Sequence, residues 1–276
     1  MGTLYVVGTP IGNLDDITFR QLDTLKSVDF IAAEDTRVTL KLLNRFEIKK
    51  PLVSFHGHSS FTVAEGIAER ILQGENAAIV TDAGMPCISD PGEVLVKLCA
   101  EKSIDIKVVP GPSAVISALA VSGLDTSRFV FEGFLSVTKK QRYRRLNELK
   151  KESRTIIFYE APHKLKTTLD DLLEYLGDRK ISLCRELTKI YEEVLRMTLS
   201  QAIAYYGEKN PKGEFVLVVE GAEKGAENEE YTLEMAVERV KQLVEQGEKA
   251  SQACKIIAKE SGFSKNQLYS ELLKEE

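Results

Sequence analysis

The segment Thr81–Gly92 is the part of the sequence whose composition points most clearly to a bound ligand. Its twelve residues include two glycines, two prolines and two aspartates, and it follows the apolar run Ala77–Val80, which is typical of a strand. A plain connection between a strand and a helix needs only about two to six residues. Glycine lets a ligand approach the backbone closely, and Asp82 could accept hydrogen bonds from an ammonium or hydroxyl group. The segment therefore predicts a ligand-binding loop.

Two further loops carry residue types that suit a binding site. Gly8-Thr9-Pro10-Ile11-Gly12-Asn13 follows the first apolar run, and Val109-Pro110-Gly111-Pro112-Ser113-Ala114 follows the fifth. In the second loop, the N–H groups that open the next helix could hold a carboxylate. Neither loop is a Gly-x-Gly-x-x-Gly or Walker A motif, so the usual dinucleotide and phosphate fingerprints are absent. Taken alone, an ordinary turn and a helix cap explain these loops at least as well.

Charged side chains follow two apolar runs in the second half of the chain. The candidates for proton transfer or electrostatic stabilisation are Glu160, His163, Arg185, Glu186 and Lys189. A glutamate there could take a proton, and a lysine or arginine could stabilise a developing alkoxide or fix a phosphate. A set of surface ion pairs explains any one of these residues equally well.

The histidines could in principle hold a metal ion. His56 and His58 lie on the same side of an extended chain. No third histidine or cysteine is near them, and His163 is the only other histidine. We therefore predict no metal site, because a zinc site needs at least three such ligands.

The segment Lys139–Lys151 carries seven basic residues and one acid. On a helix, Lys139, Arg142 and Arg145 would share one side, with Arg144 beside them. A solvated helix normally mixes both signs of charge, so this imbalance favours contact with nucleic-acid phosphates. Tyr143 could stack on a base.

Strands and helices alternate around these loops. The expected strands of the first part are Leu4–Val7, Phe30–Ala33, Leu52–Phe55, Ala77–Val80 and Ile104–Val109, and the expected helices are Thr18–Ser27, Thr36–Arg45, Thr62–Gln73, Pro91–Lys102 and Ser113–Val121. The second part has expected strands Phe129–Phe134, Thr155–Tyr159, Ile181–Cys184, Leu195–Thr198 and Phe215–Val219, with helices Lys139–Lys151, Lys164–Leu176 and Ser200–Tyr206. This order predicts an α/β fold with mixed, largely parallel sheets covered on both faces.

Two helix starts are well marked. Thr18 and Gln21 have the spacing of a capping box, and Asp90-Pro91 resembles an N-cap followed by proline at the first helical position. The loop that carries Asp90 is thus expected to end in a helix.

Breaks in the pattern divide the chain into three parts. Ser122–Ser127 interrupts the alternation, and Gly221–Glu230 is small, charged and without apolar period. We expect an N-terminal α/β domain over residues 1–123, a second α/β domain over 124–222, and a linker with a helical tail over 223–276. The tail's helices are expected at Leu233–Gln246, Ser251–Lys259 and Lys265–Lys274, with Ser264 as a cap. The tail resembles a helix-turn-helix unit, and a helical cap is an equally good interpretation.

Composition excludes several classes of protein. No run of about 18 apolar residues exists that could span a membrane, and the N-terminus is typical of a first strand and not of a signal peptide. The four cysteines are scattered, which fits a reducing cytoplasm. The formal net charge is −5, so a nucleic-acid partner would have to be held by local basic patches.

Several motifs in order resemble the tetrapyrrole methylase superfamily. They are Gly8-x-Pro10-x-Gly12, Thr81–Pro86 with Ser89–Gly92, and Val109–Ala114. Further motifs resemble the branch of it that methylates small-subunit ribosomal RNA: Ala33–Arg37, Phe131–Leu135, Tyr159–His163 and Cys184–Lys189 with Glu192-Glu193. The resemblance runs from about Leu4 to Gly221. Gly57 stands where this branch usually carries an acid.

The resemblance implies a cofactor, a geometry and a set of contacts. It implies two α/β domains that form a cleft, a homodimer, and S-adenosyl-L-methionine held between the domains. Carried over by motif, the cofactor residues would be Pro10, Ile11, Asp82, Ala83, Gly84, Met85, Ser113, Ala114, Tyr159 and Leu187. Glu160, Arg185, Glu186 and Lys189 are then the catalytic candidates. RNA contacts are expected at Arg37, His56, His58, Lys139, Arg142, Arg144, Arg145 and His163.

The implied reaction is methylation of the ribose 2′-hydroxyl of a cytidine in the decoding region of 16S rRNA, within the small ribosomal subunit in the cytoplasm. Two alternatives remain: a methyltransferase of the same superfamily that acts on a tetrapyrrole or corrinoid, and a non-enzymatic RNA-binding assembly factor. The basic helix argues against the first, because a macrocycle needs an apolar cleft. Binding of the cofactor would exclude the second.

Overall fold

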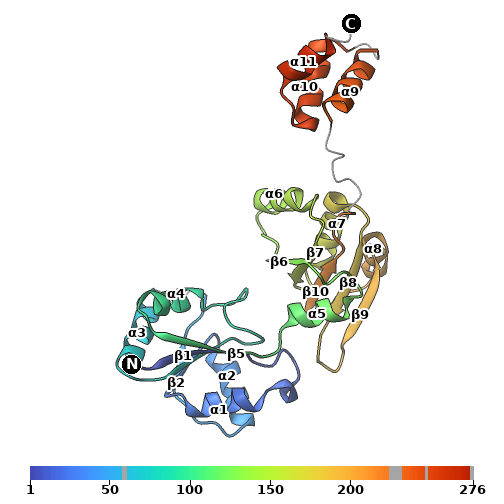
Figure 1. Cartoon of the computed structure of the whole chain (residues 1–276). Helices are drawn as coiled ribbons and strands as arrows, with labels where there is room; N and C mark the ends of the chain where they lie inside the picture. Colours follow the sequence, from blue (N-terminus) through green and yellow to red (C-terminus); the bar gives the residue numbers. More distant parts are fainter. Residues whose placement is uncertain (58–60, 224–231, 246–247, 274–276) are drawn as a thin grey trace. The chain divides into compact units, whose positions relative to one another are not determined.

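The computed structural model describes residues 1–57, 61–223, 232–245 and 248–273 (Figure 1). The chain divides into two compact units, Met1–Ala222 and Glu223–Glu276. The first unit contains two five-stranded sheets, and the second contains helices. Within the described ranges, no helix is both long and apolar enough to cross a membrane.

The first sheet is parallel throughout, with the strand order β3-β2-β4-β1-β5. Its strands are β1 (Thr3–Val7), β2 (Phe30–Ala33), β3 (Leu52–Ser54), β4 (Ala77–Val80) and β5 (Asp105–Val109). The runs β2 and β4 are buried throughout, as expected where helices cover both faces. Because the strands are parallel, the loops that follow β1, β4 and β5 lie at one edge of the sheet.

Helices cover both faces of this sheet, as predicted. Phe30 and Ile79 pack against α3 (Phe61–Leu72) and α4 (Glu93–Glu101). The next residues along the strands point the other way and pack against α1 (Phe19–Ser27) and α2 (Thr36–Arg45). This alternation is the period of two that side chains follow in a strand.

The two marked helix starts have opposite outcomes. Thr18 caps α1 with both bonds of the capping box, since the Gln21 N–H donates to Thr18 Oγ1 (3.2 Å) and the Thr18 N–H to Gln21 Oε1 (2.5 Å). The predicted start at Pro91 is wrong, because α4 begins at Glu93 with Gly92 as its N-cap. Gly92 has φ +135°, and a Cβ there would lie 2.6 Å from Cys87 Sγ. The loop folds back on itself at this glycine, and Asp90 does not cap the helix.

The second sheet is mixed, with the order β6-β7-β10-β8-β9. Its strands are β6 (Phe129–Phe134), β7 (Thr155–Glu160), β8 (Lys180–Arg185), β9 (Glu193–Thr198) and β10 (Phe215–Val219). Only the β6–β7 pairing is parallel, and β7–β10, β10–β8 and β8–β9 are antiparallel. The helices α6 (Lys139–Leu149), α7 (Leu165–Leu176) and α8 (Leu199–Tyr206) pack on one face.

The other face of the second sheet is covered by α5 (Ala114–Ser122), which directly follows β5 of the first sheet. Val115 and Leu119 of α5 pack with Ile157 and Val216 of the sheet, and the same cluster contains Ile11 and Leu187. The two halves of Met1–Ala222 are therefore joined by apolar packing. The domain boundary after residue 123 stays a prediction, and α5, although it precedes that boundary, packs on the second sheet.

The described residues of the second unit form three helices with their own core. These helices are α9 (Leu233–Glu245), α10 (Ala250–Ser261) and α11 (Lys265–Leu272). They enclose buried residues such as Val240, Ile257 and Leu268. The Gln267 N–H donates to Ser264 Oγ (3.2 Å), which confirms the predicted cap of the last helix.

Candidate active site between the two sheets

A cavity of about 350 Å³ lies between the loops of the first sheet and the ends of the second. The first half contributes the loops that follow β1, β4 and β5. The second half contributes the ends of β6, β7 and β8 and the start of β10. The lining residues are Ile11, Ala83, Gly84, Met85, Ile88, Ser89, Asp90, Ser113, Ala114, Phe134, Tyr159, Glu160, Ala161, Pro162, Cys184, Leu187, Glu214, Phe215 and Val216.

Most of the residues carried over for the cofactor line this cavity. They are Ile11, Ala83, Gly84, Met85, Ser113, Ala114, Tyr159 and Leu187. Pro10 and Asp82 instead line a neighbouring cavity of about 180 Å³, together with residues of α2. The cofactor role of each of these residues stays a prediction, but the structure brings them together from five separate segments.

Glycines allow the three loops of the first half to approach one another. A Cβ at Gly8 would lie 2.8 Å from both Gly111 Cα and Met85 Sδ. Thr9 and Gly84 exchange backbone hydrogen bonds of 2.8 and 3.1 Å, and Gly84 has φ +88°. These contacts explain why the loops are rich in glycine, because a side chain would hold them apart.

Acidic side chains gather where the first half meets the cavity. Thr81 Oγ1 donates to Glu34 Oε2 (2.5 Å), and the Asp35 N–H donates to Asp82 Oδ1 (3.1 Å). Burial and the charges of Glu34 and Asp82 raise the pKa of Asp90 to about 6. Burial, together with Glu34, also raises the pKa of Asp82. The pKa of the Asp90 carboxyl therefore lies within the pH range just below neutral.

Glu160, a predicted catalytic residue, does line the cavity from the end of β7. It is buried, and its carboxylate is already bound by the protein. Its Oε1 accepts the Ala161 N–H (2.8 Å), and its Oε2 accepts the Thr168 hydroxyl of α7. Arg142 donates to the same Thr168 hydroxyl (2.8 Å) and to Asp171 (2.5 Å). Glu160 is thus held by a buried polar chain that begins on α6.

The other predicted catalytic residues, Arg185, Glu186 and Lys189, are not among the residues that line the cavity. Arg185 donates to the Lys212 carbonyl (2.7 Å). Lys189 pairs with Glu186 (3.0 Å) and Glu214 (2.8 Å). Burial disfavours the charged form of Lys189, but the hydrogen bonds of Glu214 and Glu186 outweigh it and raise its pKa. These residues bind one another, Glu214 and the Lys212 carbonyl outside the cavity lining. A catalytic role for them stays a prediction.

Sequence reasoning missed Glu214, which lines the cavity and binds Lys189. It also assigned no ligand-binding or catalytic role to Ile88, Phe134 or Asp90, which it expected to cap a helix. Asp90 and Ile88 lie in the loop that was singled out, and Phe134 lies in a quoted motif. Glu214 carried no such signal, because it precedes a plain apolar strand.

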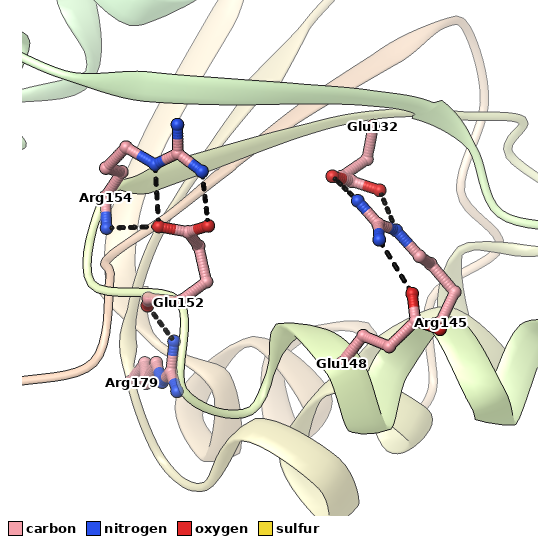
Figure 2. A network of polar contacts seen from close by, with 6 residues as sticks. All are labelled: Glu132, Arg145, Glu148, Glu152, Arg154 and Arg179. Carbon is pink, nitrogen blue, oxygen red and sulfur yellow. Dashed lines mark hydrogen bonds and ion pairs between the residues drawn. The ribbon is translucent and has the colours of Figure 1, made fainter.

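The basic helix α6 faces solvent with only part of its charge. Lys139, Lys140 and Arg144 are exposed. Arg145 is also exposed, but it binds both oxygens of Glu132 (2.7 Å each) and pairs with Glu148 (2.8 Å), as Figure 2 shows. Nearby, Arg154 pairs in the same way with Glu152 (2.7 Å). The helix therefore presents fewer free cations than its sequence suggests.

The expectation that Arg142 shares the exposed side needs a correction. Its side chain is buried and paired with Asp171, because position 142 falls on the side of α6 that packs on α7. Tyr143 stacks on Tyr175, with ring centroids 5.4 Å apart, so its ring already has a partner. Arg142 is therefore not placed to bind RNA in this structure, and stacking of a base on Tyr143 stays a prediction.

The remaining RNA candidates are scattered. Arg37 is 86% exposed and pairs with Asp35 (2.5 Å), and its hydrogen bonds lower the pKa of Asp35 to about 2. His56 and His163 are exposed. His58 lies outside the described residues. Among the residues that the structure describes, no group of three or more histidines, cysteines and acids could hold a metal ion.

Comparison with known proteins gives consistent results. The family described as Tetrapyrrole (Corrin/Porphyrin) Methylases matches residues 3–203. Proteins named Ribosomal RNA small subunit methyltransferase I are similar over nearly the whole chain. That of Halalkalibacterium halodurans is 48% identical and covers 98% of this chain and 94% of its own length, and that of Bacillus subtilis is 46% identical with 98% and 93% covered. That of Thermotoga maritima is 51% identical over 81% of this chain and all of its own length.

Solved structures show the same fold at low identity. The methyltransferase CobJ has a TM-score of 0.62 at 18% identity and covers 80% of this chain and 95% of its own. Diphthine synthase has a TM-score of 0.59 at 12% identity, with 80% and 90% covered. With the cavity, the mixed second sheet and these matches, the chain belongs to the tetrapyrrole methylase family and, within it, to the ribosomal RNA small subunit methyltransferase I family.

Proposed function

We propose that this protein transfers a methyl group from S-adenosyl-L-methionine to the ribose 2′-hydroxyl of a cytidine in the decoding region of 16S rRNA. The observation that carries the proposal is the similarity of 46–48% across nearly the whole chain to relatives named as ribosomal RNA small subunit methyltransferases. The cavity between the two sheets supplies a place for the reaction. We expect it to proceed in the cytoplasm, with the small ribosomal subunit as substrate and the protein as a homodimer.

The cavity suits the cofactor in size and chemistry. Pockets for small molecules measure about 300–1,000 Å³, and this one is about 350 Å³. Ile11, Met85 and Leu187 provide apolar walls for an adenine ring. Gly84 leaves backbone exposed to the cavity. The N-cap Ser113 of α5 makes no side-chain hydrogen bond to the helix. N–H groups in the first turn of α5, apart from that of Val115, which bonds Tyr159, can therefore donate hydrogen bonds to a carboxylate.

Methyl transfer from a sulfonium is an in-line displacement, so alignment is expected to contribute much of the rate. S-adenosylmethionine, when bound, supplies an electrophilic methyl group. The protein's share is to hold the ribose in line, to exclude water and to receive a proton. The apolar packing of Ile11 and Leu187 with α5 fixes the two halves around that site. The 2′-hydroxyl is also the group by which a protein distinguishes RNA from DNA.

The exposed cations of α6 support an RNA substrate. Lys139, Lys140 and Arg144 lie on one helix, and neither lysine appears in a salt bridge within the described residues. Unpaired lysines at a surface attract phosphates in a salt-dependent way. The solved cobalt precorrin-4 methyltransferase shares the fold at only 21% identity, so it does not argue for a macrocyclic substrate here.

The test is a labelled-methyl assay on small ribosomal subunits that lack the modification. We expect label in 16S rRNA, and we expect it as 2′-O-methylcytidine after digestion to nucleosides. Naked 16S rRNA and a corrinoid serve as parallel substrates. Label on a base, or on the corrinoid in preference to RNA, would overturn the proposal and leave the fold unchanged.

A further inference from the structure

Three carboxylates line the cavity, and they differ in their hydrogen-bond partners and in the charges near them. Glu160 accepts hydrogen bonds from Ala161 N–H and from Thr168. Glu214 holds Lys189 at 2.8 Å. Asp90, in contrast, is half-buried among other acids, and the charges that act on it come from Glu34 and Asp82. A carboxylate without a cationic partner in a partly dry site is the one most ready to accept a proton.

The chain around Asp90 holds it in place. Cys87 and Ser89 both have left-handed backbone angles, with φ of +70° and +63°. Such residues persist only where the surroundings fix them, and they gather at functional sites. Gly92 closes the loop against Cys87, and Ser89 Oγ lies 3.0 Å from the point where a Cβ on Gly133 of β6 would stand. The loop that carries Asp90 is therefore packed within the first half and lies against β6 of the second half.

Capping of a helix does not explain this arrangement of Asp90. The sequence suggests an N-cap at this position, but α4 begins at Glu93 and Gly92 is its cap. The side chain instead lines the cavity, on the loop that also carries the expected cofactor residues Gly84 and Met85.

We propose that Asp90 is the catalytic residue that accepts the proton of the substrate hydroxyl. This inference rests on the proposed function. In the step, the ribose oxygen forms a bond to the methyl carbon, and the bond between that carbon and sulfur breaks with its electron pair left on sulfur. The hydroxyl proton moves to the Asp90 carboxylate, which afterwards releases it to water. The products are the methylated ribose, a neutral thioether and a proton.

The electrostatics of the loop support this role. A general base works best when its pKa lies near the working pH, and that of Asp90 is raised to about 6 by burial and by Glu34 and Asp82, while Thr81 acts in the opposite direction. The other titratable groups nearby do not neutralise it. Burial and the charge of Asp90 raise the pKa of Tyr159 to about 12 and that of Cys87 to about 11, with Glu93 contributing at Cys87. Both stay neutral near pH 7.

The experiment compares Asp90→Asn, Glu34→Gln and the matched control Glu93→Gln, an exposed acid three residues along the chain. Single-turnover methylation of small subunits is followed from pH 5 to 9. Cofactor affinity is measured by calorimetry and RNA affinity by filter binding. A carbon-13 NMR titration of labelled aspartate carboxyls in the cofactor-free protein provides a readout independent of activity.

We expect Asp90→Asn to lower the methylation rate about 100-fold or more, which is what loss of a general base costs, with both affinities unchanged within about twofold. The wild-type rate should rise with pH through an apparent pKa near 6, matched by one NMR resonance that Asp90→Asn removes. Glu34→Gln should shift both to lower pH, because it removes a like charge. Glu93→Gln should behave as the wild type.

Several results would overturn the inference. They are an active Asp90→Asn variant, an equal loss of cofactor affinity that explains its lost rate, or a pH profile that Glu34→Gln does not move. A wild-type protein that methylates no ribose overturns the proposed function and this role together. Ribose methylation that persists in Asp90→Asn overturns the role of Asp90 alone.

Discussion

The two walls of the cavity use the same kind of side chain for different purposes. On the wall from the first half, burial and the charges of Glu34 and Asp82, which lie outside the cavity lining, raise the pKa of Asp90 to about 6. On the wall from the second half, Glu160 and Glu214 are each bound by hydrogen-bond donors or cations, through Thr168, Ala161 and Lys189. Environment, and not residue type, separates a carboxylate that can exchange a proton from one that holds the structure.

The largest expected effect concerns the buried hydrogen-bond network that holds Glu160 through Thr168, Arg142 and Asp171. Arg142→Ala should lower the free energy of unfolding by about 3–5 kcal/mol, because it leaves Asp171 buried without its cation. Arg144→Ala on the same helix, whose side chain is 77% exposed and pairs with the half-exposed Glu148 at 3.8 Å, should cost about 1 kcal/mol or less. Denaturant unfolding of both variants measures the difference. Equal losses would mean that the Arg142 pair is no more important than an exposed one.

The second prediction tests the packing around the Glu186 side chain. Gly213 has φ +88°, and a Cβ there would lie 2.5 Å from Glu186 Cγ. Gly177 has φ +81° with nothing within 4 Å. Gly177→Ala should cost about 1–3 kcal/mol from backbone strain alone, because its φ of +81° with ψ of −179° is a conformation that only glycine adopts readily. Gly213→Ala should cost about 1 kcal/mol more because it also overpacks. Thermal unfolding compares them. A Gly213→Ala protein as stable as Gly177→Ala would show that Glu186 moves aside freely.

The third prediction concerns the acid wall and pH. The pKa of Asp90 rises from 3.8 to about 6 on folding, so the native state binds this proton more tightly than the unfolded chain. Its contribution to stability is complete below about pH 3.8 and is lost as the pH rises through about 6. Asp90→Asn should therefore raise the free energy of unfolding at pH 8 by about 1–2 kcal/mol relative to the wild type.

That gain should shrink as the pH falls below 6 and vanish near pH 4. Urea unfolding at a series of pH values measures it. A variant less stable than the wild type at pH 8 would show that the Asp90 carboxylate is held by favourable contacts, and the contrast between the two walls would disappear.

The smallest effect is expected at the RNA-facing helix. Lys139→Glu with Lys140→Glu should weaken binding of 16S rRNA about five- to tenfold at low salt and much less at high salt, because fewer counterions are released. Arg145→Ala should have little effect, since Glu132 and Glu148 already neutralise that side chain. Filter binding over a salt series tests both. A larger loss from Arg145→Ala than from the lysine pair would contradict this assignment.

Local pattern predicted most of the elements but not how they pack. The strand and helix order and the Thr18 capping box are visible in the sequence because they depend on neighbours within a few residues. The predicted start of α4 was wrong because the preceding loop folds back and brings Gly92 against Cys87. Arg142 was misplaced for a similar reason, since its burial depends on Asp171 of α7, which is distant in sequence.

The residues of the candidate site were also only partly predictable from the sequence. The motifs identify Gly84, Met85 and Ser113, because a loop that binds a ligand needs unusual residues. They do not reveal Glu214, whose place in the cavity follows from the antiparallel pairing of β10 with β7 and β8. Sequence spacing also cannot tell which of Asp90, Glu160 and Glu214 lies among other acids and not beside a cation.

The central claim is that the cavity between the sheets binds the cofactor, and calorimetric titration with S-adenosyl-L-methionine tests it most directly. Ala114→Phe would fill the cavity, and Ala204→Phe on the exposed side of α8 is the matched control. We predict one bound cofactor per chain for the wild type and for Ala204→Phe, and affinity reduced about tenfold or more, at least 1.4 kcal/mol, for Ala114→Phe. No binding by the wild type, or equal binding by all three proteins, would contradict the account.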